Sequence, residues 1–326
     1  MRLGSESFST EDSLKLIMNA IECTGLSKKY GEFTALKDFN VSVEKGSVFG
    51  LLGPNGAGKS TTINILATLL TPSSGSAKIL GFDVQTQAQE VRAWVGICSG
   101  ASTFFEDLTS QEILNYYAML YGLGGQARDK KVSEVIEMFG ISEFKDDQFR
   151  ELSTGMRQKT ALAKSLLNGP QVWLLDEPTL GLDVEIAREV REIIRRMASE
   201  EDVTVLLTSH YLFEVEELCQ EVAVINHGRK IAQGKPSQIK KELGLLDVIS
   251  FTVNALDAKR LSSLQRLKGV QAVHYLKGKM VLKTMPSPSV VGSVVDELEK
   301  RKIRVRDLEV RKPTLEEAFL RLVEDA

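Results

Sequence analysis

The sequence predicts an α/β core with a mainly parallel β-sheet, followed by a small α+β domain. Short apolar strands alternate with helical patterns between residues 48 and 226, and this alternation is typical of a parallel sheet covered by helices. One of these strands runs directly into a glycine-rich loop and a helix, over residues 48–70. A new series of strands and helices begins at about Leu246, which indicates a second domain.

Apolar spacing and turn residues place the elements of the core in order. Two strands around a turn at residues 28–32 are expected between Ala20 and Val43, and a helical insertion is expected over about residues 101–170. The expected elements between and after these are strand 48–52, helix 58–70, strand 77–80, helices 113–121, 130–139 and one starting near Gly155, strand 172–175, helix 184–199, strand 203–208, helix 211–219 and strand 222–226.

The C-terminal part, residues 246–326, shows strands and helices but no residue that suggests chemistry. A regulatory or dimer-bracing role and an inert appendage are both open interpretations. Its expected elements are strand 248–253, helix 256–267, strands 271–275 and 279–284, helix 289–301, strand 303–310 and helix 314–323.

Composition limits the possible functions. The chain has 326 residues, a net charge of −3 and a pI of about 5.9, so it lacks the basic surface expected of a nucleic-acid-binding protein. Cys23, Cys98 and Cys219 follow no metal-binding spacing and are expected to be buried thiols in a reducing cytosol. No run approaches about 18 apolar residues, so no membrane-spanning helix is predicted. Residues 1–20 are expected to be an N-terminal extension, and Met18 is a hypothetical natural start.

The loop that follows strand 48–52 predicts binding of a nucleoside triphosphate. Glycines allow successive backbone N–H groups to converge on a phosphate chain, and the following helix adds its positive end. In this pattern the lysine reaches the β/γ-phosphates and the serine hydroxyl binds Mg²⁺. The loop reads Gly53-Pro54-Asn55-Gly56-Ala57-Gly58-Lys59-Ser60, followed by Thr61.

Two further segments are informative. Asp176 ends an apolar strand, where it could hold Mg²⁺ through water, and Glu177 beside it could orient an attacking water. Ser153 and Gly155 stand at the expected start of a helix, where a hydroxyl and a backbone N–H can grip a phosphate. Alone, Ser153 would be interpreted as an ordinary helix cap.

Five motifs follow one another along the chain in the order found in the ATP-binding subunits of ABC transporters. Residues 21–245 therefore resemble this family. The resemblance implies an ABC-type P-loop NTPase fold with a mainly parallel sheet, an antiparallel β subdomain and a helical insertion. It also implies that ATP and Mg²⁺ are bound. The motifs are residues 53–61 (Walker A), 152–156 (signature), 175–178 (Walker B), 181–183 (D-loop) and His210 (switch histidine).

The resemblance implies a role for each matching residue. Tyr30 stacks on adenine, residues 53–61 hold the phosphates, and Ser153 with Gly155 contacts the ATP of a second subunit. Ser60 is a ligand of Mg²⁺, and Asp176 holds the metal through water. Glu177 is the catalytic carboxylate, and His210, also assigned to catalysis, contacts the γ-phosphate.

The same resemblance implies partners and a location. Two ATP-binding subunits, here most simply two copies of this chain, close on ATP and open after hydrolysis, and they drive a separate integral-membrane permease. No nucleic-acid partner is expected. The chain is therefore predicted to be cytoplasmic and peripheral on the inner face of the cell membrane.

The sequence departs from the family pattern at Gly100, where most members carry a glutamine that touches Mg²⁺. Water, Ser99 or Ser102 could replace it, or the linker could be re-routed, and we expect water. The Ser-Thr-Gly-Met signature at 153–156 and the segment 312–319 resemble the type-2 exporter subfamily that includes daunorubicin-resistance ATPases.

Three functions remain open at this point. The expected one is the motor ATPase of a type-2 ABC exporter. A soluble ABC-type ATPase acting on a ribosome or a nucleic-acid complex is the first alternative, and the acidic balance argues against it. A regulator that hydrolyses ATP poorly is the second, which Gly100 favours and Glu177 disfavours. Phe104 and Phe105 are expected either to lie near a groove for the permease or to pack in the core.

Overall fold

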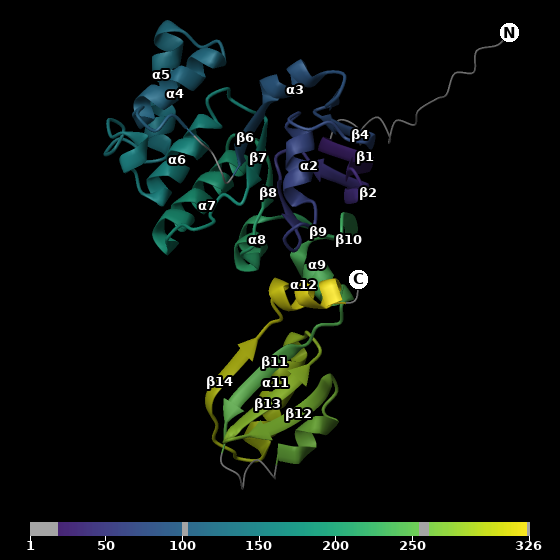
Figure 1. Cartoon of the computed structure of the whole chain (residues 1–326). Coiled ribbons are helices and arrows are strands. Elements are labelled where there is room, and N and C mark those ends of the chain that lie inside the picture. Colours follow the sequence, from purple (N-terminus) through teal and green to yellow (C-terminus); the bar gives the residue numbers. More distant parts are fainter. Residues whose placement is uncertain (1–18, 100–103, 254–260, 325–326) are drawn as a thin grey trace, which may run out of the picture. The chain divides into compact units, whose positions relative to one another are not determined.

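The computed structural model describes residues 19–99, 104–253 and 261–324, and Figure 1 shows the chain. These residues form two compact units, which divide at residue 236. The predicted second domain began ten residues later, at 246. The intervening helix α9 (Pro236–Glu242) packs against α12 (Leu315–Glu324), the last helix of the chain, and so belongs with the second unit.

A six-stranded sheet forms the centre of the first unit, in the order β10-β9-β3-β8-β7-β6. The five strands from β9 to β6 are parallel and β10 adds an antiparallel edge, so the prediction of a mainly parallel sheet is confirmed. Their residues are almost all buried, as expected when helices cover both faces. The strands are β3 (Val48–Leu52), β6 (Val95–Ser99), β7 (Val172–Asp176), β8 (Thr204–Thr208), β9 (Glu221–Asn226) and β10 (Arg229–Gly234).

A second, antiparallel sheet has the order β2-β1-β4-β5. Its inner side chains, including Phe39, form one hydrophobic cluster with helix α2 (Lys59–Leu66) and with Phe49 of β3. This cluster fixes the helix that follows the phosphate loop between the two sheets. The strands are β1 (Asn19–Tyr30), β2 (Phe33–Glu44), β4 (Ser74–Ile79) and β5 (Phe82–Asp83).

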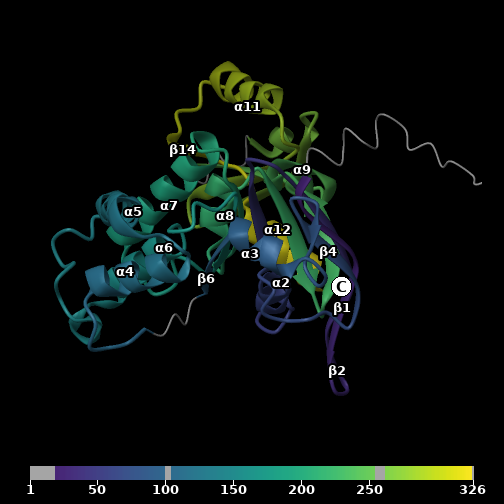
Figure 2. The same cartoon turned by 90° about the horizontal axis from the view of Figure 1, so that it is seen from above.

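The predicted helical insertion lies between β6 and β7. It contains α4 (Ser110–Leu120), α5 (Gly125–Met138), a short 3-10 turn at Phe149–Glu151 and α6 (Thr154–Lys164). In both Figure 1 and Figure 2 these helices form a group apart from α2 and the antiparallel sheet. Helix α3 (Ala88–Trp94) precedes β6, and α7 (Val184–Ser199) and α8 (Leu212–Leu218) follow β7 and β8.

Helix α2 is shorter than predicted. The apolar spacing extended it to Leu70, but it ends at Leu66 because Thr68 adopts a left-handed backbone with φ of 61°. The N–H groups of Leu69 and Leu70 both donate to the carbonyl of Asn64, which closes the turn. The chain can then reverse into β4.

The second unit has a four-stranded antiparallel sheet in the order β12-β13-β11-β14. Helix α11 (Pro288–Lys300) packs Val294 and Leu298 against Phe251 and Leu282, and these residues belong to a separate hydrophobic core. The predicted strand 303–310 is found at 306–311, and of the predicted helix 256–267 only Leu261–Arg266 is described, as a 3-10 helix. The strands are β11 (Asp247–Thr252), β12 (Val270–Leu276), β13 (Lys279–Thr284) and β14 (Arg306–Arg311).

Every helix in the described ranges is too short or too polar to cross a bilayer. Residues 1–20 are the expected N-terminal extension. Of these, residues 1–18, which include Met18, lie outside the described residues.

We expect the three cysteines to be unreactive in the folded protein. Cys23, Cys98 and Cys219 are buried. Burial, with a smaller contribution from Glu22, raises the pKa of the Cys23 thiol to about 12, and burial also raises the pKa of Cys219. Because the thiolate is the reactive form, Ellman's reagent at about pH 8 should label none of them natively and all of them in denaturant. Labelling of native protein within minutes would contradict the burial.

Candidate functional site

The ends of three neighbouring strands bring the predicted site residues together. Strands β3, β8 and β7 are parallel, and Thr208 of β8 pairs with Leu51 on one side and with Asp176 on the other. The loop 53–58, Glu177 and the segment with His210 leave these strands at the same edge of the sheet. Residues separated by more than 150 positions therefore converge on one location.

The glycine loop requires its glycines. Gly58 has φ of +110°, and a Cβ there would lie 2.6 Å from the carbonyl oxygen of Ala35. A Cβ on Gly53 would collide with the carbonyl of Ile225 in β9. Close packing against two neighbouring strands thus fixes the loop, while Ser60 remains exposed and Thr61 half-buried at the start of α2.

Lys59 lies within the loop and is only 5% exposed. Its Nζ donates to the carbonyls of Gly53 (2.8 Å) and Pro54 (3.1 Å). Burial lowers the pKa of this amine, and the negative charges of Glu177 and Asp176 partly raise it again. In its protonated form this amine supplies a positive charge within the loop, which can pair with a phosphate chain.

Thr208 holds the two carboxylate residues in place. Its hydroxyl donates to Oδ1 of Asp176 at 2.6 Å and accepts from the backbone N–H of Glu177 at 3.0 Å. Thr208 is not among the predicted site residues, because a threonine at the end of an apolar strand has no distinctive pattern. Its position directly before Ser209 and His210 is the signal that could have drawn attention to it.

Glu177 has an unusual backbone and a close partner. Its φ is +54°, in the left-handed region that residues with a side chain rarely adopt. Nε2 of His210 lies 2.7 Å from Oε1 of Glu177, so a proton on this nitrogen forms a hydrogen bond to the carboxylate. Both side chains are partly accessible, at 34% for His210 and 18% for Glu177, and solvent or a ligand can reach them.

The predicted signature residues begin helix α6. Ser153 is the N-cap and its Oγ accepts from the N–H of Met156 at 3.3 Å. Gly155 is buried against Ile186 at the start of α7. In the described residues, no hydrogen bond or ion pair links 153–155 to the loop 53–61. The structure of one chain therefore does not bring these two groups of predicted residues together.

The remaining predicted residues have different surroundings. Tyr30 is 48% exposed at the turn between β1 and β2, with the Lys28 amine 5.2 Å from its ring centroid. Gly100 and Ser102 lie outside the described residues. Phe104 is buried against Phe149 and Tyr117, so the interpretation of core packing holds for it, whereas Phe105 is 62% exposed and does not pack in the core.

Magnesium would find suitable oxygen ligands here. Ser60 offers an exposed hydroxyl, and Asp176 keeps a carboxylate oxygen, Oδ2, that receives no hydrogen bond from the described part of the chain. Hydroxyl and carboxylate oxygens together with phosphate and water are the ligands that Mg²⁺ prefers. In the described residues no cluster of three His, Cys, Asp or Glu could hold a metal, so the substrate phosphates would have to complete the shell.

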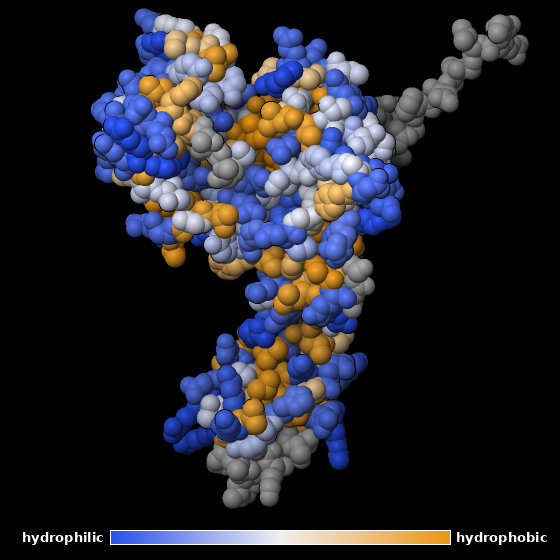
Figure 3. Space-filling view, in the orientation of Figure 1, coloured by the Kyte–Doolittle hydropathy of each residue, from blue (hydrophilic) through white to orange (hydrophobic). Residues whose placement is uncertain are grey.

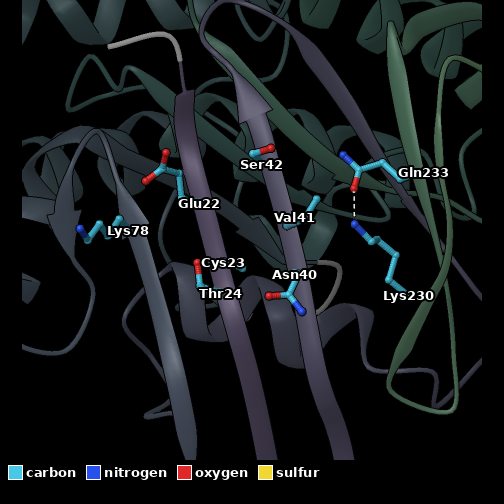
Figure 4. Close-up of a pocket in the computed structure, with 9 residues that line it drawn as sticks. All are labelled: Glu22, Cys23, Thr24, Asn40, Val41, Ser42, Lys78, Lys230 and Gln233. Atoms are coloured by element: carbon cyan, nitrogen blue, oxygen red, sulfur yellow. Dashed lines mark hydrogen bonds between the residues drawn. The ribbon is translucent and has the colours of Figure 1, made fainter. Parts of the chain in front are cut away.

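Two cavities lie away from this edge of the sheet. One, of about 600 Å³, is lined by β1, β2, β4 and β10, and includes Asn40 and the hydrogen-bonded pair Lys230 and Gln233, as Figure 4 shows. The other, of about 830 Å³, lies within the second unit near Pro288 and Val310. Neither contains a residue of the five motifs.

Comparison with known proteins supports the sequence resemblance. A sequence model described as "ABC transporter" matches residues 36–180. The linearmycin resistance ATP-binding protein of Bacillus subtilis is 32% identical over 93% of this chain and 97% of its own length. The daunorubicin/doxorubicin resistance ATP-binding protein of Streptomyces peucetius is 34% identical over 93% and 92%. A solved ATP-binding subunit of an ABC transporter, 28% identical, covers 69% of this chain and 93% of its own, with a TM-score of 0.64.

We expect Thr208→Val to destabilise the first unit by about 1–3 kcal/mol, since it leaves Asp176 without its donor and Glu177 N–H without one of its acceptors. Thr208→Ser keeps the hydroxyl and should retain most of this stability. Urea unfolding followed by tryptophan fluorescence measures both, because Trp94 and the fully buried Trp173 of β7 both lie in the first unit. Equal losses in the two variants would show that the hydroxyl is unimportant.

Proposed function

This chain belongs to the ABC transporter family of ATP-binding ATPases, and we propose that it is the motor subunit of a type-2 exporter. The proposal is supported most directly by the convergence of Lys59, Asp176, Glu177 and His210 at the ends of β3, β7 and β8. Relatives over nearly the whole chain, which are resistance proteins against linearmycin and daunorubicin, favour export as its task.

The residues of this edge, together with Tyr30 at the end of β1, can each take part in ATP binding or hydrolysis. The loop 53–61 binds the triphosphate, Lys59 neutralises its charge, and Tyr30 stacks on adenine. Glu177 orients and accepts a proton from the attacking water. His210, hydrogen-bonded to Glu177, contacts the γ-phosphate and keeps the carboxylate oriented. The strained backbone of Glu177 is consistent with such a role, since strain of this kind gathers at active sites.

Mg²⁺ would be held by Ser60 directly and by Asp176 through water. Bound there, it would supply positive charge that neutralises the charge of the phosphates. Thr208 then serves to orient Asp176 toward the metal through the 2.6 Å hydrogen bond.

Two copies of the chain would form the complete enzyme. Ser153 and Gly155 carry phosphate-binding groups at a helix N-terminus, but they have no bonded link to the loop of their own chain among the described residues. Ser153 is exposed, so a second subunit can approach it. We propose that each ATP lies between the loop of one copy and Ser153–Gly155 of the other, and that the second unit, which begins at residue 236, is an accessory domain.

The membrane partner would be a permease that docks on the helical region. Figure 3 shows hydrophobic side chains in the recess between this region and the side that carries α3. Phe105, exposed and stacked edge-to-face on Tyr116 with ring centroids 6.1 Å apart, offers a rigid apolar contact. This contact would hold the chain on the cytoplasmic face of the membrane.

A mixing experiment tests the shared site. Lys59→Ala and Ser153→Arg should each abolish ATPase activity, and a mixture of the two should recover about a quarter of the wild-type rate. Half of random dimers combine both variants, and each of these retains one intact site out of two. ATP hydrolysis by the separate and mixed proteins measures this. If the mixture stays inactive, the two groups of residues do not complete each other across subunits.

Affinity purification from detergent-solubilised membranes tests the exporter assignment. The tagged chain should recover an integral-membrane protein, and Phe105→Asp should reduce that recovery at least about tenfold, because a buried charge opposes an apolar contact. Phe33→Asp, similarly exposed at 60% but at the start of β2, is the control and should not reduce it. Recovery of ribosomal RNA in place of a membrane protein would favour the soluble alternative.

A further inference from the structure

Helix α8 carries a buried carboxylate that the roles above leave unused. Glu214 is only 8% exposed, and both of its oxygens have short contacts. Oε2 accepts from the hydroxyl of Thr179 at 2.5 Å, and Oε1 lies 2.6 Å from Nη1 of Arg191. Thr179 is also buried, at 2%, and the Arg191 side chain is 13% exposed.

These three residues connect three segments of the proposed site. Thr179 stands two positions after Glu177, and Glu214 four positions after His210. Arg191 belongs to α7, which begins immediately after the D-loop residues 181–183. One carboxylate therefore joins the segments that carry the two residues proposed for hydrolysis, as well as the helix that follows the D-loop.

The segment after Glu177 needs such an anchor. The N–H of Glu177 is held by the carbonyl (3.2 Å) and hydroxyl of Thr208, but its left-handed backbone costs of order 1 kcal/mol. From 177 to 183 the chain makes tight turns, with Leu180 N–H bonded to Glu177 O and Leu182 N–H to Thr179 O. Thr179 is the side chain that ties these turns to α8.

Stability alone gives a weak reason for this arrangement. A buried ion pair recovers little more than the cost of taking its charges out of water, and apolar residues of the same volume often stabilise a fold equally well. A fully bonded carboxylate does restrict geometry, however, because its two oxygens bind donors on two different segments. The contact between Glu177 and His210, at 2.7 Å, depends on the relative position of the two segments that Glu214 joins.

We propose that Glu214 is a positioning residue, which sets the geometry of the Glu177–His210 pair through Thr179. The inference rests on the hydrolytic roles proposed above for that pair. A displacement near 1 Å of a catalytic group can reduce turnover about 100-fold, so the effect falls on kcat and leaves ATP binding by the loop 53–61 nearly unchanged.

The first test removes only the hydrogen bond between Thr179 and Glu214. Thr179→Val deletes the hydroxyl but leaves the Arg191–Glu214 ion pair, and should lower kcat at least about tenfold with KM changed less than about threefold. Thr179→Ser keeps the donor and should stay within about threefold of wild type. Glu192→Gln removes an exposed ion pair on α7, to Arg195, and should leave kcat unchanged. Normal kcat in Thr179→Val, or an equal loss in Thr179→Ser, overturns the proposal.

A second measurement does not depend on turnover. The chain has three histidines, so NMR can resolve the imidazole of His210 from those of His227 and His274. Thr179→Val and Glu214→Gln should shift the His210 resonances and leave the other two in place, and unshifted His210 resonances overturn the proposal. Glu177→Gln tests the hydrolytic role of Glu177 separately from the positioning role of Glu214. If it hydrolyses ATP normally, the role of Glu177 is wrong, while a His210 shift in Thr179→Val still establishes the positioning.

Discussion

The pairing of β3, β8 and β7 is the constraint on which the site depends. Thr208 pairs with Leu51 on one side and with Asp176 on the other. The phosphate loop, the carboxylates and the histidine therefore follow their strands at the same edge of the sheet. A shift of one residue in β8 would turn the Thr208 side chain to the opposite face, and both of its hydrogen bonds to the β7 end would be lost. The buried side chains of these strands oppose such a shift, because their alternation is matched to the helices on each face. Packing in the core thus fixes the positions of the proposed site residues at the edge of the sheet.

The sequence carried most of the information about the first unit. The loop 53–60 and its flanking strand and helix follow from local rules, because glycine conformation and apolar spacing act over a few residues. The contact of His210 with Glu177, by comparison, needs the sheet order, and no local pattern contains it. Glu214 was missed for the same reason. An acidic residue on an amphipathic helix is normally exposed, and here partners 23 and 35 positions away bury it.

The elements that were not predicted also have physical explanations. β10 (Arg229–Gly234) lacks apolar alternation because it is an edge strand, which among the described strands pairs only with β9. The signal available for it was the turn at His227 and Gly228, both with positive φ, which is typical of a tight hairpin. The second unit starts earlier than expected because α9 contributes its apolar side to α12, a contact between residues nearly 80 positions apart, which Arg321 reinforces by donating to Leu243 O. Spacing along the chain cannot reveal such a partner.

The left-handed backbone of Glu177 has an evolutionary consequence. At φ of +54°, glycine would relieve strain of order 1 kcal/mol, and asparagine would fit more easily than glutamate. Drift toward greater stability would therefore favour replacement of the one side chain to which we assign proton transfer. A population selected only for abundance or heat tolerance should lose this carboxylate early, and a laboratory screen that scores folding alone would discard function at this position. At this position the residue that best fits the backbone and the residue that we propose for the chemistry are therefore different.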